Sequence, residues 1–215
     1  MTWFFESEDK NHKYDLSHLT QNEMGIEFGP IQDDEALLLY AVCKVVQAQT
    51  IIEFGGLGGY SAKNFLKAMG DEGVLYTVDN NPNTISLSQN HRVIIKNVGD
   101  VTPYDFDSKT IDLLFFDCHD LNQQRQAFHT LKEAKLITPD TLLAIHDTGT
   151  HPSKLCNWSY PSPYGWIHQP SERELVNYLQ SQDYYSIPFH CPNPRPPLLC
   201  RHGLTLLHPK IRLNT

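Results

Sequence analysis

The sequence lacks any apolar run long enough to span a membrane, and its amino terminus becomes acidic at Glu6, too early for a signal peptide. It also lacks an excess of positive charge, because 17 Lys and Arg residues stand against 25 Asp and Glu residues, a formal charge of −8. A groove for a nucleic-acid backbone needs Lys and Arg in excess. We therefore expect a protein that binds neither a membrane nor nucleic acid.

Cysteine is scarce as well, with five residues in 215 and no CxxC pair. An odd number without paired spacing favours a reduced, cytoplasmic protein. A zinc site built from His190-Cys191 and Cys200-Arg201-His202 is the alternative, but its spacing matches no zinc pattern, and we favour ordinary residues flanking a Pro-rich loop. Internal repeats and linkers are also lacking, so we predict one domain over residues 1–215.

Short apolar runs alternate with helical stretches along most of the chain. After a polar amino-terminal cap segment, residues 1–30, apolar residues at helical spacing predict a helix from Pro30 to about Gln49. The next predicted elements are strands at Thr50–Phe54, Val74–Asp79, Val93–Lys96, Ile111–Asp117 and Thr141–Ile145, and helices at Ser61–Met69 and Leu121–Leu136. This alternation indicates a Rossmann-like α/β fold, a doubly wound parallel sheet with helices on both faces.

The carboxyl-terminal part departs from this pattern. A capping box opens a helix at Ser171–Ser181, and two β-like stretches follow, Tyr184–Phe189 and Leu204–His208. Because a prolyl segment and no helix joins these two stretches, they predict an antiparallel pair at one edge of the sheet. The sheet then has about seven strands and is mostly parallel, with an antiparallel last strand.

A glycine-rich loop follows the first strand, where open α/β sheets bind their ligands. In Glu53-Phe-Gly-Gly-Leu-Gly-Gly-Tyr-Ser61, four glycines let the backbone approach a ligand, and a helix amino terminus follows with free N–H groups. Asp79 ends the second strand, where a carboxylate can accept hydrogen bonds from both ribose hydroxyls of a nucleoside. A tight turn, and a cap for a helix begun at Pro82, are the plainer interpretations, but loop and acid together favour a nucleoside site.

Two features favour S-adenosylmethionine over NAD as this nucleoside. When the dinucleotide fingerprint G-x-G-x-x-G/A is aligned with Gly56 and Gly58, Ser61 occupies the position of its third glycine or alanine. Glu53 would repel a pyrophosphate, whereas it would tolerate an ammonium or sulfonium group. An NAD-dependent reductase therefore stays as an alternative of another class, as does a nucleoside-binding protein without catalysis.

These motifs resemble those of the metal-dependent catechol-type and caffeoyl-type O-methyltransferases, which are class I S-adenosylmethionine-dependent methyltransferases. The glycine loop resembles their first motif, E-x-G-x-x-x-G-Y-S, and Asp79-Asn-Asn-Pro82 resembles their acid-x-N-P signature. Ile111–Asp117 and Leu142–Asp147 resemble their fourth and fifth strands. The resemblance covers about residues 30–150, and the terminal strand pair fits the family's seven-stranded sheet.

The resemblance implies a role for each matching residue. The methionine portion of the cofactor should be surrounded by Glu53, Gly55, Gly56, Gly58, Gly59, Tyr60 and Ser61. Asp79 should hold the ribose, Asp100 should border the adenine, and Asp117 could also lie near the methionine ammonium. Asp117 and Asp147, with His146 at or beside a ligand position, should hold a divalent cation, commonly Mg²⁺, that binds the acceptor hydroxyl.

The residue types agree with a hard cation at these strand ends, since carboxylate oxygens are its preferred ligands and the ion would lower the pKa of a bound hydroxyl. A metal-free site with His146 or His119 as general base, and a set of ordinary loop residues, are the two alternatives. The family's catalytic Lys, three positions after the fourth-strand Asp, is replaced here by Asp120. The general base is therefore open, and catechol is disfavoured as the acceptor.

The segment 148–170 is rich in aromatic residues and proline, and we interpret it as a loop on the substrate side. Its rings either form a wall over an acceptor or cover the edge of the core; they are Trp158, Tyr160, Tyr164 and Trp166. The sequence as a whole predicts an O-methyltransferase for a small-molecule hydroxyl, with a metal-free N- or O-methyltransferase as the alternative. A homodimer stays open.

Overall fold

The computed structural model describes most of the chain between Ile31 and Lys210. Only the backbone is described for residue 33 and for the strands within 159–168. The described residues are 31, 33–148, 159–162, 165–168, 171–189 and 203–210. Within this part of the chain, no helix is long and apolar enough to cross a membrane.

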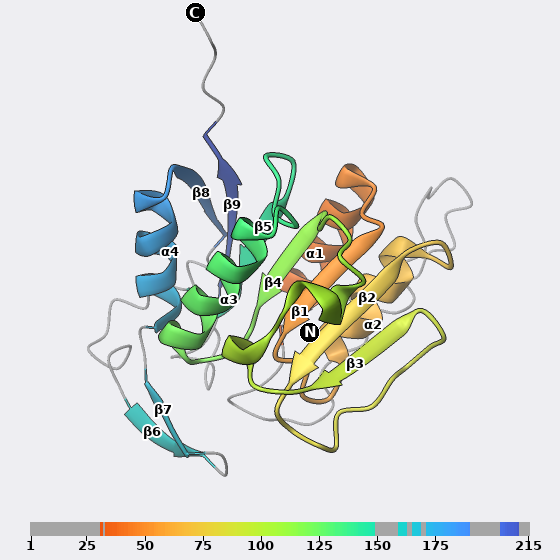
Figure 1. Ribbon diagram of the computed structural model, residues 1–215, viewed down its shortest axis with the longest axis horizontal. Coiled ribbons are helices and arrows are strands. Elements are labelled where there is room, and N and C mark those ends of the chain that lie inside the picture. Colours follow the sequence, from red (N-terminus) through yellow and green to blue (C-terminus); the bar gives the residue numbers. More distant parts are fainter. Residues whose placement is uncertain are drawn as a thin grey trace, which may run out of the picture.

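Seven strands form one sheet in the order β3-β2-β1-β4-β5-β9-β8 (Figure 1). Their bounds are β1 Thr50–Phe54, β2 Val74–Asp79, β3 His91–Ile95, β4 Leu113–Phe116, β5 Leu142–Ile145, β8 Tyr184–Phe189 and β9 Leu204–Pro209. The strands from β3 to β5 are parallel, and β9 is antiparallel to both of its neighbours. The predicted fold class, a mostly parallel sheet of about seven strands with an antiparallel last strand, is confirmed.

Two pairs of helices cover the two faces of this sheet (Figure 1). The helices are α1 Asp33–Val46, α2 Tyr60–Met69, α3 Leu121–Glu133 and α4 Ser171–Ser181. Because side chains alternate along a strand, Ile51 packs in the cluster beneath α1 and α2, while Ile52 packs in the cluster beneath α3 and α4. Burial on both faces explains why the central strands are mostly apolar runs in the sequence.

The connections between the strands differ more from the prediction than the strands do. No helix begins at Pro82: residues 80–90 form turns and extended chain between β2 and β3. Two short 3₁₀ helices, Val98–Asp100 and Pro103–Phe106, lead from β3 toward β4. The alternative interpretation of Asp79, as a cap for a helix begun at Pro82, is therefore wrong.

The segment predicted as a substrate-side loop contains a hairpin. Strands β6 Ser159–Ser162 and β7 Gly165–His168 pair in antiparallel fashion, apart from the main sheet (Figure 1). Their aromatic side chains, the cap segment 1–30 and the residues proposed for a zinc site lie outside what the structure describes. The roles suggested for them stay predictions.

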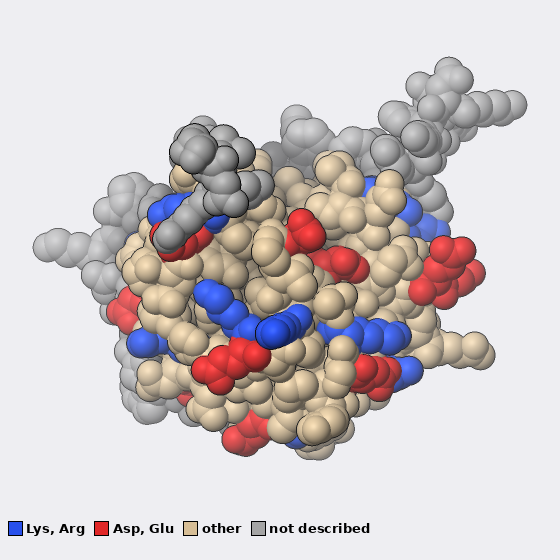
Figure 2. Space-filling model, turned by 45° about the horizontal axis from the view of Figure 1, so that its top comes forward, with Lys and Arg blue, Asp and Glu red and all other residues tan. Residues whose placement is uncertain are grey.

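The described part of the protein surface carries both positive and negative side chains. On the face shown in Figure 2, Lys and Arg side chains form a short band across the middle, with Asp and Glu side chains on both sides of it. No broad area of one sign covers the described part of this face. Mixed charges of this kind are typical of an ordinary solvated surface.

Candidate functional site

The glycine loop leaves β1 through a backbone conformation that only glycine adopts easily. Gly55 has φ of +94°, and a Cβ atom on it would lie 2.3 Å from the carbonyl oxygen of Asp117, at the end of β4. Gly59 also has a positive φ, of 76°, and it precedes the first residue of α2. The loop is thus pressed against the end of β4 and then turns directly into a helix amino terminus.

Asp79 holds this loop from the end of β2. Its Oδ2 accepts hydrogen bonds from the backbone N–H groups of Gly56 and Leu57, both at 2.9 Å. Its Oδ1 accepts one from the N–H of Asn81 at 2.9 Å. The acid predicted to bind ribose therefore lies against the glycine loop, and its carboxylate also fixes the shape of that loop.

Glu53 lies beneath the loop and is completely buried. Its carboxylate accepts hydrogen bonds from the hydroxyl of Ser61, on α2, and from that of Thr77, on β2, the latter at 2.6 Å. Burial raises the pKa of Glu53 to about 7, although both hydrogen bonds lower it. The site therefore keeps a carboxyl group in an apolar setting where its charge is costly, which is common at functional sites.

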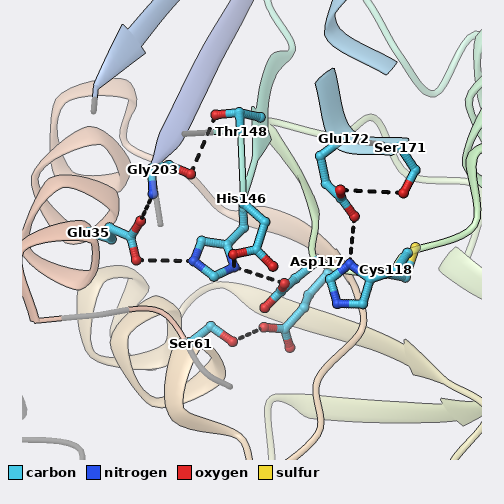
Figure 3. A network of polar contacts seen from close by, with 12 residues as sticks. Glu35, Ser61, Asp117, Cys118, His146, Thr148, Ser171, Glu172 and Gly203 are labelled. Carbon is cyan, nitrogen blue, oxygen red and sulfur yellow. Dashed lines mark hydrogen bonds and ion pairs between the residues drawn. The ribbon is translucent and has the colours of Figure 1, made fainter. Parts of the chain in front are cut away.

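A second cluster of charged groups lies at the ends of β4 and β5 (Figure 3). The Nδ1 atom of His146 is 2.9 Å from Oδ1 of Asp117 and 3.6 Å from Oδ1 of Asp147. Its Nε2 atom is 3.1 Å from Oε2 of Glu35, whose Oε1 accepts a hydrogen bond from the N–H of Gly203 at 2.6 Å. The cluster thus joins α1, β4, β5 and the chain just before β9.

Three carboxylates determine the charge state of His146. Burial by itself lowers the pKa of His146, but Asp147, Asp117 and Glu35 outweigh burial and raise that pKa well above its ordinary value. Glu35 is the residue that the sequence reasoning missed. The available signal was its position: Glu35 lies four residues before the buried Leu39 and so faces the sheet with the apolar side of α1.

The same cluster is the candidate metal centre. One ligand atom each from Asp117, His146 and Asp147 can be chosen so that all lie within 4.8 Å of one another. The two carboxylates fit a hard cation well, whereas His146 would have to release a carboxylate before one of its nitrogens could bind an ion. Asp147 has φ of 58°, a left-handed conformation that concentrates at functional sites.

His119 belongs to a third group of contacts. Its Nδ1 lies 2.5 Å from Oε1 of Glu172, a buried residue in the first turn of α4 (Figure 3). Asp120, which replaces the family's Lys, is the amino-terminal cap of α3 and accepts hydrogen bonds from the N–H groups of Asn122 and Gln123. The carboxylate of Asp120 therefore caps α3. His119 is then the candidate for a general base in the segment that follows β4.

The structure thus brings most of the predicted residues to one edge of the sheet, at the carboxyl ends of β1, β2, β4 and β5. Asp100 lies in the 3₁₀ helix that follows β3, where it accepts a hydrogen bond from the side chain of Asn97 at 3.2 Å. Among the described residues, no contact joins Asp100 to Glu53 or to the cluster of Asp117, His146 and Asp147. His151 lies outside the described residues.

A glycine loop after β1, an acid at the end of β2 and this strand order are the features that the resemblance to class I methyltransferases predicts. Residues 52–148 match the family described as a methyltransferase domain, and this range contains the loop, Asp79, Asp117 and Asp147. The predicted resemblance to class I S-adenosylmethionine-dependent methyltransferases is confirmed. The match favours this class over the NAD-dependent reductase.

Solved structures support the same fold. An O-methyltransferase from Bacillus cereus in complex with SAH shares 14% identity, covering 84% of this chain and 83% of its own, with a TM-score of 0.60. A proposed caffeoyl-CoA O-methyltransferase from Staphylococcus aureus shares 16%, covering 85% and 86%, with a TM-score of 0.63.

An O-methyltransferase from Streptomyces achromogenes involved in tomaymycin synthesis, in complex with SAM, shares 15% identity and has a TM-score of 0.56. The similarity covers 84% of this chain and 82% of the Streptomyces chain. No curated protein sequence matches this one significantly. At identities this low, the structural similarity shows the fold, and the choice of acceptor has to be argued from the site.

Proposed function

We propose that this protein transfers the methyl group of S-adenosylmethionine to a hydroxyl group of a small-molecule acceptor. One observation carries the proposal: Asp79 accepts two hydrogen bonds of 2.9 Å from the glycine loop, beside a cluster of the half-buried Asp117 and the buried His146 and Asp147. A nucleoside site and a charged reaction site then share one edge of the sheet. This is where an open α/β sheet binds its ligands.

The cofactor would lie across the loop. Glu53 and the segment from Gly55 to Ser61 would surround the methionine portion, with Asp117 near its ammonium group. A ribose hydroxyl would donate to Oδ1 of Asp79, which accepts one backbone hydrogen bond and can accept a second. Asp100 would border the adenine. The negative groups beneath and beside the loop favour a cofactor that carries positive charge.

The reaction would be an in-line transfer, in which the bond from the methyl carbon to sulfur breaks as the bond to the acceptor oxygen forms. The protein's main contribution would be the alignment of the two reactants. A divalent cation, Mg²⁺ by preference, would be held by Asp117 and Asp147, with His146 at or beside the ion. When bound, such an ion lowers the pKa of a hydroxyl that it contacts.

His119 is a candidate for accepting the proton of the acceptor hydroxyl. The observation that favours it is the 2.5 Å contact from its Nδ1 to the buried Glu172, which holds the ring in one orientation. A carboxylate in this position favours the tautomer with the proton on Nδ1, so that Nε2 is the basic atom. His119 would then serve either with the cation or, in a metal-free enzyme, in its place. His146, the other metal-free candidate, could accept a proton only after one of its nitrogens leaves its carboxylate partner.

Methyl transfer from S-adenosylmethionine labelled in the methyl group tests this proposal directly. The acceptors would be a panel of phenols, catechols, sugars and hydroxy acids, assayed with Mg²⁺ and with excess chelator. Label on a hydroxyl of any acceptor supports the proposal, and loss of that label in Asp147→Ala assigns the reaction to this site. Cofactor binding without transfer across a broad panel would instead indicate a nucleoside-binding protein without catalysis.

A further inference from the structure

A buried chain of hydrogen bonds runs from the glycine loop to the edge of the sheet. Nε2 of His91, the first residue of β3, lies 2.9 Å from Oγ1 of Thr77 on β2. Thr77 in turn lies 2.6 Å from Oε2 of Glu53, and Ser61 contacts the other carboxylate oxygen. All four side chains are buried. Neither the cofactor contacts nor the reaction proposed above account for His91 and Thr77.

The direction of these hydrogen bonds follows from the backbone. The N–H of Leu87 donates to Nδ1 of His91 at 3.1 Å, so Nδ1 accepts and the proton of the neutral ring is on Nε2. Nε2–H therefore donates to Thr77, whose own hydroxyl donates to Glu53. Burial lowers the pKa of His91, in agreement with a neutral ring. Every donor in the chain thus points toward the carboxylate, an arrangement in which each bond polarises the next.

The carboxylate at the end of this chain lies directly beneath the loop. A Cβ atom placed on Gly56 would be 3.3 Å from Oε2 of Glu53 and 2.2 Å from the Cγ2 methyl of Thr77. The two groups of Thr77 therefore have separate tasks, since its methyl supports Gly56 and its hydroxyl contacts Glu53. A substitution that keeps one group and removes the other can separate them.

We propose that Thr77 and His91 are positioning residues for the cofactor, because they fix the Glu53 carboxylate beneath the loop where it attracts the ammonium of the methionine portion. The inference rests on the proposed function, which places that portion at Glu53. A carboxylate that accepts from two hydroxyl groups, one of them held in turn by a further donor, keeps its orientation without moving when the ligand arrives. Thr77 and His91 would then affect binding of the amino-acid portion and leave binding of the nucleoside portion unchanged.

Calorimetry on the full-length protein with two probes tests this separation. S-adenosylhomocysteine carries the ammonium, whereas 5′-methylthioadenosine has the same nucleoside and thioether but no amino-acid portion. Thr77→Val keeps the methyl against Gly56 and removes the hydroxyl, so it should weaken S-adenosylhomocysteine binding by about tenfold or more, as for a hydrogen bond to a charged group. Its affinity for 5′-methylthioadenosine should stay the same.

Matched variants complete the design. Thr77→Ser keeps the hydroxyl and should bind S-adenosylhomocysteine as the wild type does. His91→Leu removes the outer donor and should weaken the binding of S-adenosylhomocysteine but not that of 5′-methylthioadenosine. His91→Gln keeps an N–H donor at the position of Nε2 and should bind S-adenosylhomocysteine as the wild type does. Tyr76→Phe removes a hydroxyl from the same strand on the opposite face, where it donates to Asp107 at 2.9 Å, and should change neither affinity.

Equal losses for both probes in Thr77→Val and His91→Leu would overturn the inference, because they would show that the chain only supports the loop. Unchanged affinity for S-adenosylhomocysteine in both variants would overturn it as well. If Thr77→Val does not fold, the comparison of His91→Leu with His91→Gln decides the question. A wild-type protein that binds neither probe would contradict the proposed function itself, a result distinct from any pattern among the variants.

Discussion

Replacing Glu53 with glutamine is expected to stabilise the free protein at alkaline pH while weakening its cofactor binding. Glu53 is completely buried, and burial raises its pKa from the ordinary 4.5 to about 7. The folded state therefore holds this proton more tightly than the unfolded state does. The stability that results is fully present below about pH 4.5 and is lost as the pH rises through about 7.

The size of the effect follows from the two pKa values. The rise from 4.5 to about 7 corresponds to about 3 kcal/mol of unfolding free energy lost by the wild type at pH 8. Glutamine has the same shape, carries no charge, and can still accept a hydrogen bond from Ser61 or Thr77. The variant should therefore avoid most of this loss, and its advantage over the wild type should grow with pH.

Urea unfolding of both proteins at pH 5 and at pH 8 measures the difference. The free energy of unfolding of Glu53→Gln, relative to the wild type, should rise by about 2–3 kcal/mol between these two pH values. Calorimetry at pH 8 should show weaker binding of S-adenosylhomocysteine to the same variant. A difference in stability that does not change with pH would refute the reasoning, because the Glu53 carboxyl would then not titrate in this range.

Four further substitutions test the cofactor and metal assignments. Asp79→Ala should weaken S-adenosylhomocysteine binding by about 1–3 kcal/mol in calorimetry, since ribose hydroxyls lose their acceptor; an unchanged affinity would remove Asp79 from the ribose site. Gly59→Val should fold but lose cofactor binding, because φ is 76° and the added Cβ atom would lie 3.0 Å from Cδ1 of Leu87; full affinity in a folded variant would count against the loop placement. Asp147→Ala should lose methyl transfer and keep most cofactor affinity, whereas Asp117→Ala should damage both; full turnover of the wild type in excess chelator would exclude the metal.

The central strands could be predicted from the sequence because they are short, mostly apolar runs buried on both faces. Thr50–Phe54, Val74–Asp79 and Tyr184–Phe189 coincide with β1, β2 and β8, and the loop that follows β1 is where the glycines predict it. The helix suggested at Pro82 failed because its evidence was a proline at a helix start and no apolar periodicity. The hairpin of β6 and β7 was missed because proline and aromatic residues are also typical of loops.

The partners of the site residues could not be predicted, because they come from distant parts of the chain. Glu35 contacts His146 across 111 residues of sequence, and Glu172 contacts His119 across 53. A charge in a helix is most often solvated, and although the position of Glu35 on the apolar side of its helix indicates burial, it does not indicate a partner. Only the packing of α1 and α4 against the sheet shows that these carboxylates are buried beside histidines.

The central claim, a methionine nucleoside bound across the glycine loop, is tested most directly by calorimetry on the wild-type protein. S-adenosylmethionine, S-adenosylhomocysteine and NAD would each be titrated with Mg²⁺ present and again with chelator. Both methionine nucleosides should bind, with and without the ion, because their contacts lie on the loop and on Asp79, while NAD should give no heat of binding. Binding of NAD without binding of either methionine nucleoside would contradict the account.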